Sequence, residues 1–286
     1  MVTATYAVNC SILLTDLPLL QRPSAARAAG FDAVEFWWPF DSPTPGDAEA
    51  QTFIAAVKDA GVQLSGLNFA AGNMPAGDRG ILSDPAMTGA FRDNVDIAVG
   101  IAEALGTRAF NALYGNCAEG LARAAQDEVA GENLAFAGRA AERIGAVVLI
   151  EPVSGAPRYP IKTASDAIGV IDRVGGQHGA TNLRLLADLY HLAVNGDDVS
   201  AAIRDCSGRI GHVQIADAPG RGEPGTGELP LGSYLEQLFA AGYDGYIGLE
   251  YKPTRADTFD WLPTDERGAR RVRAESLPRQ TEMRIK

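Results

Sequence analysis

The chain alternates between short apolar runs that end in a polar residue and longer alanine-rich stretches whose apolar positions recur at helical spacing. This alternation is typical of repeated strand–helix units built around a parallel sheet. Eight of the apolar runs have the length of buried strands. They are Tyr6–Asn9, Ala33–Phe36, Leu64–Asn68, Arg108–Asn111, Val147–Glu151, Leu183–Asp188, Ile210–Ile215 and Tyr246–Glu250.

The stretches between these runs predict helices, several of which are followed by a glycine, a common residue at helix C-termini. We expect helices over Leu17–Ala29, Asp47–Ala60, Pro85–Leu105, Ala124–Ile144, Thr163–Val174, Val199–Asp205 and Tyr234–Ala241. Eight sequential units in one chain favour a single closed (β/α)8 TIM barrel. The alternative is an open, doubly wound sheet, which would need a glycine-rich phosphate loop after its first strand. The sequence there reads CSILLTDLP.

The predicted barrel occupies residues 1–253, and residues 254–286 form a C-terminal helix or tail of the same domain. This tail is polar and contains four arginines, which we interpret as a solvated last helix or a frayed end. They are Arg267, Arg270, Arg271 and Arg273.

The composition of the chain limits which molecules the protein could bind and in which cellular compartment it is expected. The formal net charge of −11 argues against a nucleic-acid partner, which would need a basic face. No apolar run is long enough to cross a membrane, and the N-terminus lacks the basic and apolar segments of a signal peptide. We therefore expect a cytoplasmic protein. Its three cysteines (Cys10, Cys117 and Cys206) are widely spaced and predict buried thiols rather than disulfides.

Every predicted strand has a carboxylate or an amide as its last or second-last residue. These residues are Asn9, Glu35, Asn68, Asn111, Glu151, Asp188, Gln214 and Glu250. The carboxyl ends of barrel strands meet at one face, where barrel enzymes place their active sites. Three carboxylates at close range need a compensating charge. Glu151, Asp188, Gln214 and Glu250 therefore predict an oxygen-rich site for Mg²⁺ or Mn²⁺. The alternative is that Glu151 and Glu250 are structural and pair with arginines.

The three histidines differ in their predicted roles. His191 follows Asp188 by three residues and can reach the same face, so we expect it to contact a substrate. His212 precedes Gln214 by two positions and points to the same side one layer deeper, which predicts a supporting or core role. His178 lies in a predicted loop and should be exposed. The sequence 69–83, rich in Gly and Pro, predicts a lid over the site.

At these residues the chain resembles the hydroxypyruvate isomerase family of the xylose isomerase-like barrel superfamily. The resemblance runs to about Pro253, and its longest motifs are DLYH, GHVQIADAPGRGEPGTGE and GYDGYIGLEYKP. It implies interconversion of hydroxypyruvate and tartronate semialdehyde, or of a related 2-oxo acid, and a homodimer or homotetramer. It implies the same four metal ligands, with Co²⁺ as a further possible ion. Trp37–Trp38, Asp78 and Gly222 depart from the family pattern in loops over the mouth and leave the natural substrate open.

This resemblance leads to a mechanistic hypothesis. Glu151 and Glu250 would exchange a proton with the substrate through an enediolate. Arg221 would bind the substrate carboxylate, since a guanidinium can do so bidentately, although a loop salt bridge with Glu223 is the alternative. Asn68 is a further substrate contact. The competing functions are a ketose or sugar 3-epimerase on the same scaffold, a multi-metal phosphoester hydrolase, for which three histidines are few, and a barrel that only binds a metabolite.

Overall fold

The computed structural model describes residues 4–268, and in it eight parallel strands close into a barrel in sequence order. The strands are β1 (Thr5–Asn9), β2 (Ala33–Phe36), β3 (Gln63–Asn68), β4 (Ala109–Asn111), β5 (Val147–Ile150), β6 (Leu183–Asp188), β7 (Ile210–Ile215) and β8 (Tyr246–Leu249). The first strand pairs with the last, so the sheet has no free edge. The predicted TIM barrel is confirmed, and the open sheet is excluded.

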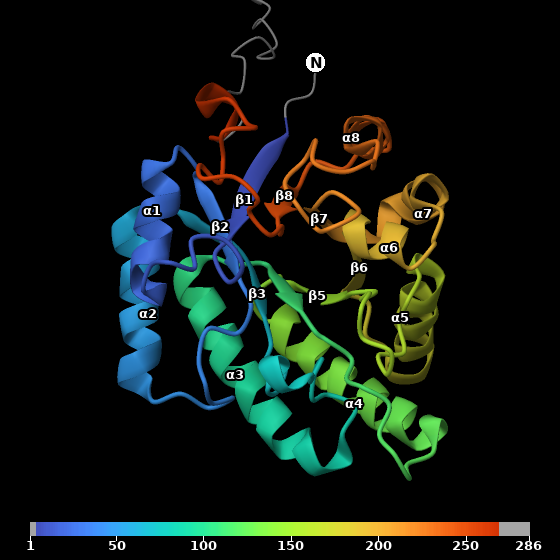
Figure 1. Ribbon diagram of the computed structural model, residues 1–286. Helices are drawn as coiled ribbons and strands as arrows, with labels where there is room; N and C mark the ends of the chain where they lie inside the picture. Colours follow the sequence, from blue (N-terminus) through green and yellow to red (C-terminus); the bar gives the residue numbers. More distant parts are fainter. Residues whose placement is uncertain (1–3, 269–286) are drawn as a thin grey trace, which may run out of the picture.

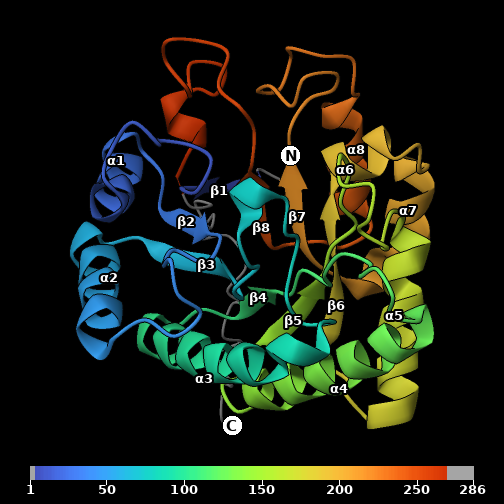
Figure 2. The same ribbon diagram turned by 60° about the horizontal axis from the view of Figure 1, so that its bottom comes forward.

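Helices form a ring around the strands (Figures 1 and 2). They are α1 (Arg22–Ala28), α2 (Asp47–Ala60), α3 (Thr88–Leu105), α4 (Arg123–Glu142), α5 (Ala164–His178), α6 (Leu189–Val194), α7 (Val199–Cys206) and α8 (Leu231–Ala240). No helix within residues 4–268 combines the length and the apolarity needed to cross a membrane.

Two helices differ most from the sequence-based expectation. The helix expected over Leu17–Ala29 is shorter: a 3-10 turn covers Leu19–Gln21, and α1 begins at Arg22. Pro18 has an extended backbone conformation and directly precedes the 3-10 turn. A second proline, Pro23, lies in the first turn of α1, where proline is tolerated. The short α6 was not expected, because six residues give too little periodicity to recognise.

Both α6 and α7 follow β6, and within the described residues no α-helix follows β8. An irregular segment, 254–268, lies there instead and contains one 3-10 turn, Thr264–Glu266. In Figure 2 it lies between α1 and α8. Its Phe259 ring lies 4.8 Å from Phe31, centroid to centroid, and its Arg267 donates to the carbonyl of Ala29 at 3.0 Å. Three of the four tail arginines, at 270, 271 and 273, lie outside the described residues.

Smaller predictions had mixed outcomes. Cys10 is buried as expected, whereas Cys117 and Cys206 are partly exposed, and all three thiols are free. His178 is exposed, but it is the last residue of α5 rather than part of a loop.

The barrel interior is polar at the end where the strands finish. All eight predicted strand-end residues are buried, with exposures between 1% for Asn9 and 8% for Asn68. Register places several of them at the same level: Asn9 opposite Glu35, and Asp188 opposite Gln214. Ala109, Leu149 and Leu186 form a small buried apolar cluster, and a small pocket remains in the interior. Its lining includes Asn9, Glu35, Gly66, Asn68, Asn111, Leu149, Leu186, His212 and Gln214.

Candidate active site

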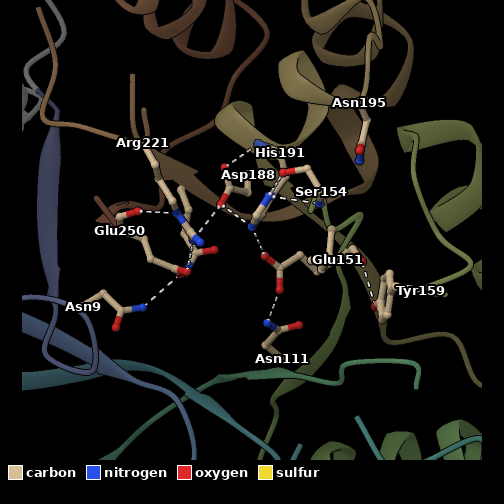
Figure 3. Close-up of polar contacts among 12 residues, drawn as sticks. Asn9, Asn111, Glu151, Ser154, Tyr159, Asp188, His191, Asn195, Arg221 and Glu250 are labelled. Atoms are coloured by element: carbon tan, nitrogen blue, oxygen red, sulfur yellow. Dashed lines mark hydrogen bonds and ion pairs between the residues drawn. The ribbon is translucent and has the colours of Figure 1, made fainter. Parts of the chain in front are cut away.

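Three carboxylates, one histidine and one arginine converge at the carboxyl ends of β5 to β8 (Figure 3). Glu151 directly follows β5, Asp188 ends β6 and Glu250 follows β8. His191 lies in α6, and Arg221 lies in the loop after β7. Parallel strands bring these residues together from positions up to 99 apart in the chain, counting from 151 to 250.

Glu151, Asp188 and His191 form the tightest group. Their candidate ligand atoms all lie within 4.8 Å of one another. The Asp188 Oδ1 atom accepts the His191 backbone N–H at 3.1 Å and so caps α6. The other carboxylate oxygen, Oδ2, is buried without a hydrogen-bond partner and lies 3.6 Å from His191 Nε2. A buried carboxylate oxygen in this state is suited to a positively charged ligand.

The tautomer of His191 follows from its contact with Ser154. The backbone N–H of Ser154 donates to Nδ1 at 3.1 Å, and the hydroxyl lies 2.7 Å from the same atom. Because Nδ1 accepts, the neutral ring carries its proton on Nε2, which faces Asp188 and Glu151. Burial lowers the pKa of His191 to about 4, which keeps the ring neutral. In this tautomer His191 presents an N–H donor to Asp188 and Glu151.

Replacing Ser154 with alanine tests this arrangement. The variant loses one of the two contacts that orient the ring, which is worth about 1 kcal/mol for a typical hydrogen bond, so we expect kcat/KM to fall about fivefold. The affinity for a divalent cation should not change, because the backbone contact remains and no ligand is removed. Steady-state kinetics and a metal titration measure the two quantities, and unchanged kinetics would show that the hydroxyl does not orient His191.

Arg221 is paired with two carboxylates of the site. Its Nη2 donates to Glu250 Oε1 in a short contact and lies 3.8 Å from Asp188 Oδ2, and its Nε donates to the Glu250 carbonyl at 3.3 Å. The guanidinium also lies over the Tyr190 ring, 5.4 Å from its centroid. The alternative prediction, a salt bridge between Arg221 and Glu223, is wrong.

Glu223 instead bonds to residues that follow β8. Its carboxylate accepts from the Thr254 backbone N–H at 3.0 Å and the Thr254 hydroxyl at 2.8 Å, and it lies 3.2 Å from Arg255 Nε. Glu223 is 1% exposed, so these contacts fasten the loop after β7 to the loop after β8. Sequence adjacency suggested the wrong partner, because the two loops lie side by side only once β7 and β8 pair in the barrel.

The loop that carries Arg221 is held tightly. Asp217, 1% exposed, accepts backbone N–H groups from Ala218, Gly225 and Leu229 at 2.9–3.0 Å. Arg221 itself has φ 63°, a left-handed conformation that is uncommon for a residue other than glycine. A conformation of this kind persists only where the surroundings enforce it, and it is concentrated at functional sites.

Amides support the carboxylates from neighbouring strands. Asn111 Nδ2 donates to Glu151 Oε2 at 2.6 Å, and Asn9 Nδ2 donates to Glu250 Oε2 at 3.0 Å. The sequence predicted both asparagines at strand ends but indicated no role for them, and it did not indicate Ser154. Asn68 lies opposite Asn111 in register and lines the interior pocket, on the far side of Asn111 from Glu151.

Gln214 lies beside Asp188 in the sheet register and presents its amide oxygen without a partner. Its Nε2 donates to Glu35 Oε1 at 2.6 Å, whereas Oε1 is buried and makes no hydrogen bond. Two of the four predicted metal ligands, Asp188 and Gln214, thus carry buried oxygens that protein groups leave unsatisfied. Such atoms usually bind water or an ion.

The charge balance also fits a cation. Burial, and then the charge of Asp188, raise the pKa of Glu151. Burial raises the pKa of Glu250 well above its usual range, against the opposing effect of Arg221. Without a further positive charge, these carboxyl groups resist ionisation together. Three carboxylates and an amide oxygen are hard ligands, so this set of residues fits a divalent cation of the Mg²⁺ or Mn²⁺ type.

Known proteins with related sequences span nearly the whole chain. A Streptomyces coelicolor protein named "Putative hydroxypyruvate isomerase" is 54% identical over 272 residues, covering 93% of this chain and 98% of that protein. The hydroxypyruvate isomerase of Escherichia coli is 32% identical and covers 87% and 93%. A 2-oxo-tetronate isomerase of Cupriavidus necator is 36% identical and covers 90% and 96%.

Solved structures agree on the fold. A Brucella melitensis protein described as AP endonuclease, family 2, is 34% identical with a TM-score of 0.81, covering 90% of this chain and 97% of that one. A D-psicose 3-epimerase has a TM-score of 0.71 at 19% identity, with 86% and 84% covered, which shows a shared fold alone. The family model described as xylose isomerase-like TIM barrel matches residues 23–273. This chain belongs to the hydroxypyruvate isomerase family of the xylose isomerase-like TIM barrels, and it is an isomerase.

Proposed function

We propose that the protein interconverts hydroxypyruvate and tartronate semialdehyde, or a closely related 2-oxo-tetronate, by proton transfer through an enediolate. The observation that carries the proposal is the position of Glu151 and Glu250 at the ends of β5 and β8, with Asp188 beside them. The His191 Nε2 atom lies 3.9 Å from Glu151 and 3.6 Å from Asp188, while Arg221 pairs with Glu250 and lies 3.8 Å from Asp188. The relatives named for these two reactions support the substrate class.

Glu151, Asp188, Gln214 and Glu250 would hold one divalent cation, Mg²⁺ or Mn²⁺, with Co²⁺ as a further candidate. When bound, the cation would stabilise negative charge on the substrate oxygens. The two unpartnered oxygens of Asp188 and Gln214 support this ligand set.

The proton transfers follow from the positions of the two glutamates. In the forward direction one carboxylate takes a proton from the CH₂ carbon of hydroxypyruvate, and the other carboxyl returns a proton to the former carbonyl carbon. A proton must also pass between the two substrate oxygens, and the Nε2–H of His191 would donate to one of them. Asn111 and Asn9 each hold one oxygen of a glutamate, which orients the carboxylate for transfer.

Arg221 is proposed to bind the substrate carboxylate. Its contacts with Glu250 use Nε and Nη2, which leaves the Nη1 amino group for an incoming anion. Asn68, on the opposite wall, is a further contact.

The lid, residues 69–83, would exclude water from the enediolate. Its last part is fixed, because Ile81, Leu82 and Ser83 are buried and Gly80 packs against the Leu113 carbonyl with no room for a side chain. We therefore assign any movement of the lid to its exposed part, residues 72–79.

A ketose or sugar 3-epimerase remains the alternative, because it would use the same cation and the same two glutamates. The test is to strip the protein of metal and assay it with added Mg²⁺ or Mn²⁺ on hydroxypyruvate, a 2-oxo-tetronate and a ketohexose. We expect the protein to isomerise at least one of the two acids when metal is added. Without metal, the rate of that reaction should be more than about a hundredfold lower. Turnover of the ketohexose alone would favour the epimerase, and metal-independent turnover would refute the cation.

We further propose a homodimer or homotetramer in the cytoplasm. Light scattering coupled to size-exclusion chromatography measures the assembly, and a monomer at micromolar concentration would contradict it.

A further inference from the structure

A fourth buried carboxylate lies beside the proposed cation site, and the reaction described above does not use it. Glu35 belongs to β2, is 3% exposed and points into the barrel. A buried carboxylate normally needs charged or hydrogen-bonding partners. Glu35 has three, all from the barrel interior: His212 Nε2 at 2.6 Å, Gln214 Nε2 at 2.6 Å and Asn9 Nδ2 at 3.0 Å.

The barrel provides space for this carboxylate through a glycine. A Cβ atom at Gly248 of β8 would lie 2.7 Å from both Glu35 oxygens and 2.8 Å from Gln214 Cγ. Such distances are too short for any side chain to occupy that position without displacement. Glu35 and Gln214 thus fill the space that a larger residue at position 248 would take, and the two side chains are packed as a unit.

The contact decides which end of the Gln214 amide is left free for a ligand. A glutamine can present either an oxygen or an NH₂ group, and only the oxygen can bind a cation. An ionised carboxylate accepts hydrogen bonds and cannot donate them, so Glu35 engages Nε2 and leaves Oε1 free. The structure shows this outcome, because Oε1 is the buried atom without a partner.

The same carboxylate also reaches Glu250. Asn9 Nδ2 is shared between Glu35 Oε1 at 3.0 Å and Glu250 Oε2 at 3.0 Å. An acceptor at Glu35 holds the Asn9 amide with its NH₂ toward both carboxylates. Glu35 is thereby connected to two of the four proposed ligands, one directly and one through Asn9, while His212 holds its second oxygen.

We propose that Glu35 is a positioning residue for the cation site, which turns the Gln214 amide oxygen toward the ion and, through Asn9, holds Glu250. This proposal rests on the proposed metal-dependent function. It assigns to His212 the task of fixing Glu35, in agreement with the supporting role expected from its position one layer below Gln214.

The test measures Mn²⁺ binding directly, by calorimetric titration of the metal-free protein, so it does not depend on knowing the substrate. Partners one step removed from a metal typically contribute ten- to a hundredfold in affinity. We expect Glu35→Met to weaken Mn²⁺ binding by about that factor. Glu35→Gln keeps an oxygen that can accept from Gln214, so it should recover part of the loss.

A second set of variants, made in a Gln214→Glu protein, distinguishes whether Glu35 orients the side chain at position 214 or only fills space. In a Gln214→Glu protein the side chain presents an oxygen in either orientation, and it is repelled by Glu35. There, Glu35→Gln should leave Mn²⁺ affinity unchanged or raise it, whereas in the wild-type background the same change lowers it. This loss or reversal of the effect in a double-mutant cycle is not expected from a residue that only fills space.

The control is Asn133→Leu. Asn133 is a fully buried asparagine of α4, which accepts from Arg92 and donates to the Leu82 carbonyl. This change should lower the thermal midpoint with no effect on Mn²⁺ affinity. Wild-type affinity in folded Glu35→Met protein overturns the positioning role alone. A wild-type protein that binds no divalent cation overturns the cation site and this inference together, and a protein that binds Mn²⁺ without isomerising either acid overturns only the proposed reaction.

Discussion

Replacing Glu151 with glutamine should reduce kcat by about a thousandfold and leave the fold intact. A general acid or base contributes about 10²–10⁴ to the rate, and an amide cannot exchange a proton at neutral pH. The side chain has nearly the same shape, and its amide oxygen can still accept from Asn111 Nδ2, which now holds Glu151 Oε2 at 2.6 Å. Steady-state kinetics with hydroxypyruvate and circular dichroism measure the two effects.

The stability of the metal-free variant gives a second readout. Glu151 lies in the same buried group as Asp188, and its pKa is raised because burial and the Asp188 charge oppose its ionisation. A neutral amide removes that repulsion, so the thermal midpoint without metal should stay the same or rise. Glu142→Gln, an exposed position at the end of α4, is the matched control and should change neither quantity. Near-wild-type turnover in the Glu151 variant would refute its catalytic role.

Replacing Arg221 with methionine should lower kcat/KM for hydroxypyruvate by about a hundredfold or more. The guanidinium, 16% exposed, is the positive partner of Glu250 and lies 3.8 Å from Asp188 Oδ2. Removing one member of a buried ion pair costs about 3–5 kcal/mol because the remaining charge is left unpaired. The proposed role in substrate binding adds a rise in KM, since the substrate carboxylate loses its partner.

Arg221→Lys separates the loss of the ion pair with Glu250 from the loss of substrate binding. Lysine keeps the positive charge but loses the planar array of donors, so the Glu250 pair should be partly retained while the KM effect remains. Neither variant should suffer from the left-handed backbone at this position more than arginine does, because all three residues carry a Cβ atom. An unchanged KM for hydroxypyruvate in both variants would show that another group binds the carboxylate.

Most of the architecture was predictable from the chain because it depends on local patterns. Apolar runs of three to six residues form the eight strands. The polar residue at the end of each run lies buried at one end of the barrel, as the parallel arrangement requires. The prediction was wrong where local signals are weak: the helix expected from Leu17 begins at Arg22, and the short α6 has too few residues to show a period.

The sequence by itself determined which residues could meet, because strand order and alternation place Glu151, Asp188, Gln214 and Glu250 at one face of a closed barrel. Only the tertiary structure decided how they are held. Asn9 contacts Glu250 across 241 positions, and Glu35 contacts Gln214 across 179. These contacts exist because β1 closes the barrel against β8, an event that no local pattern records. The orientation of the Gln214 amide follows from that closure, whereas the partner of Arg221 follows from the pairing of β7 with β8.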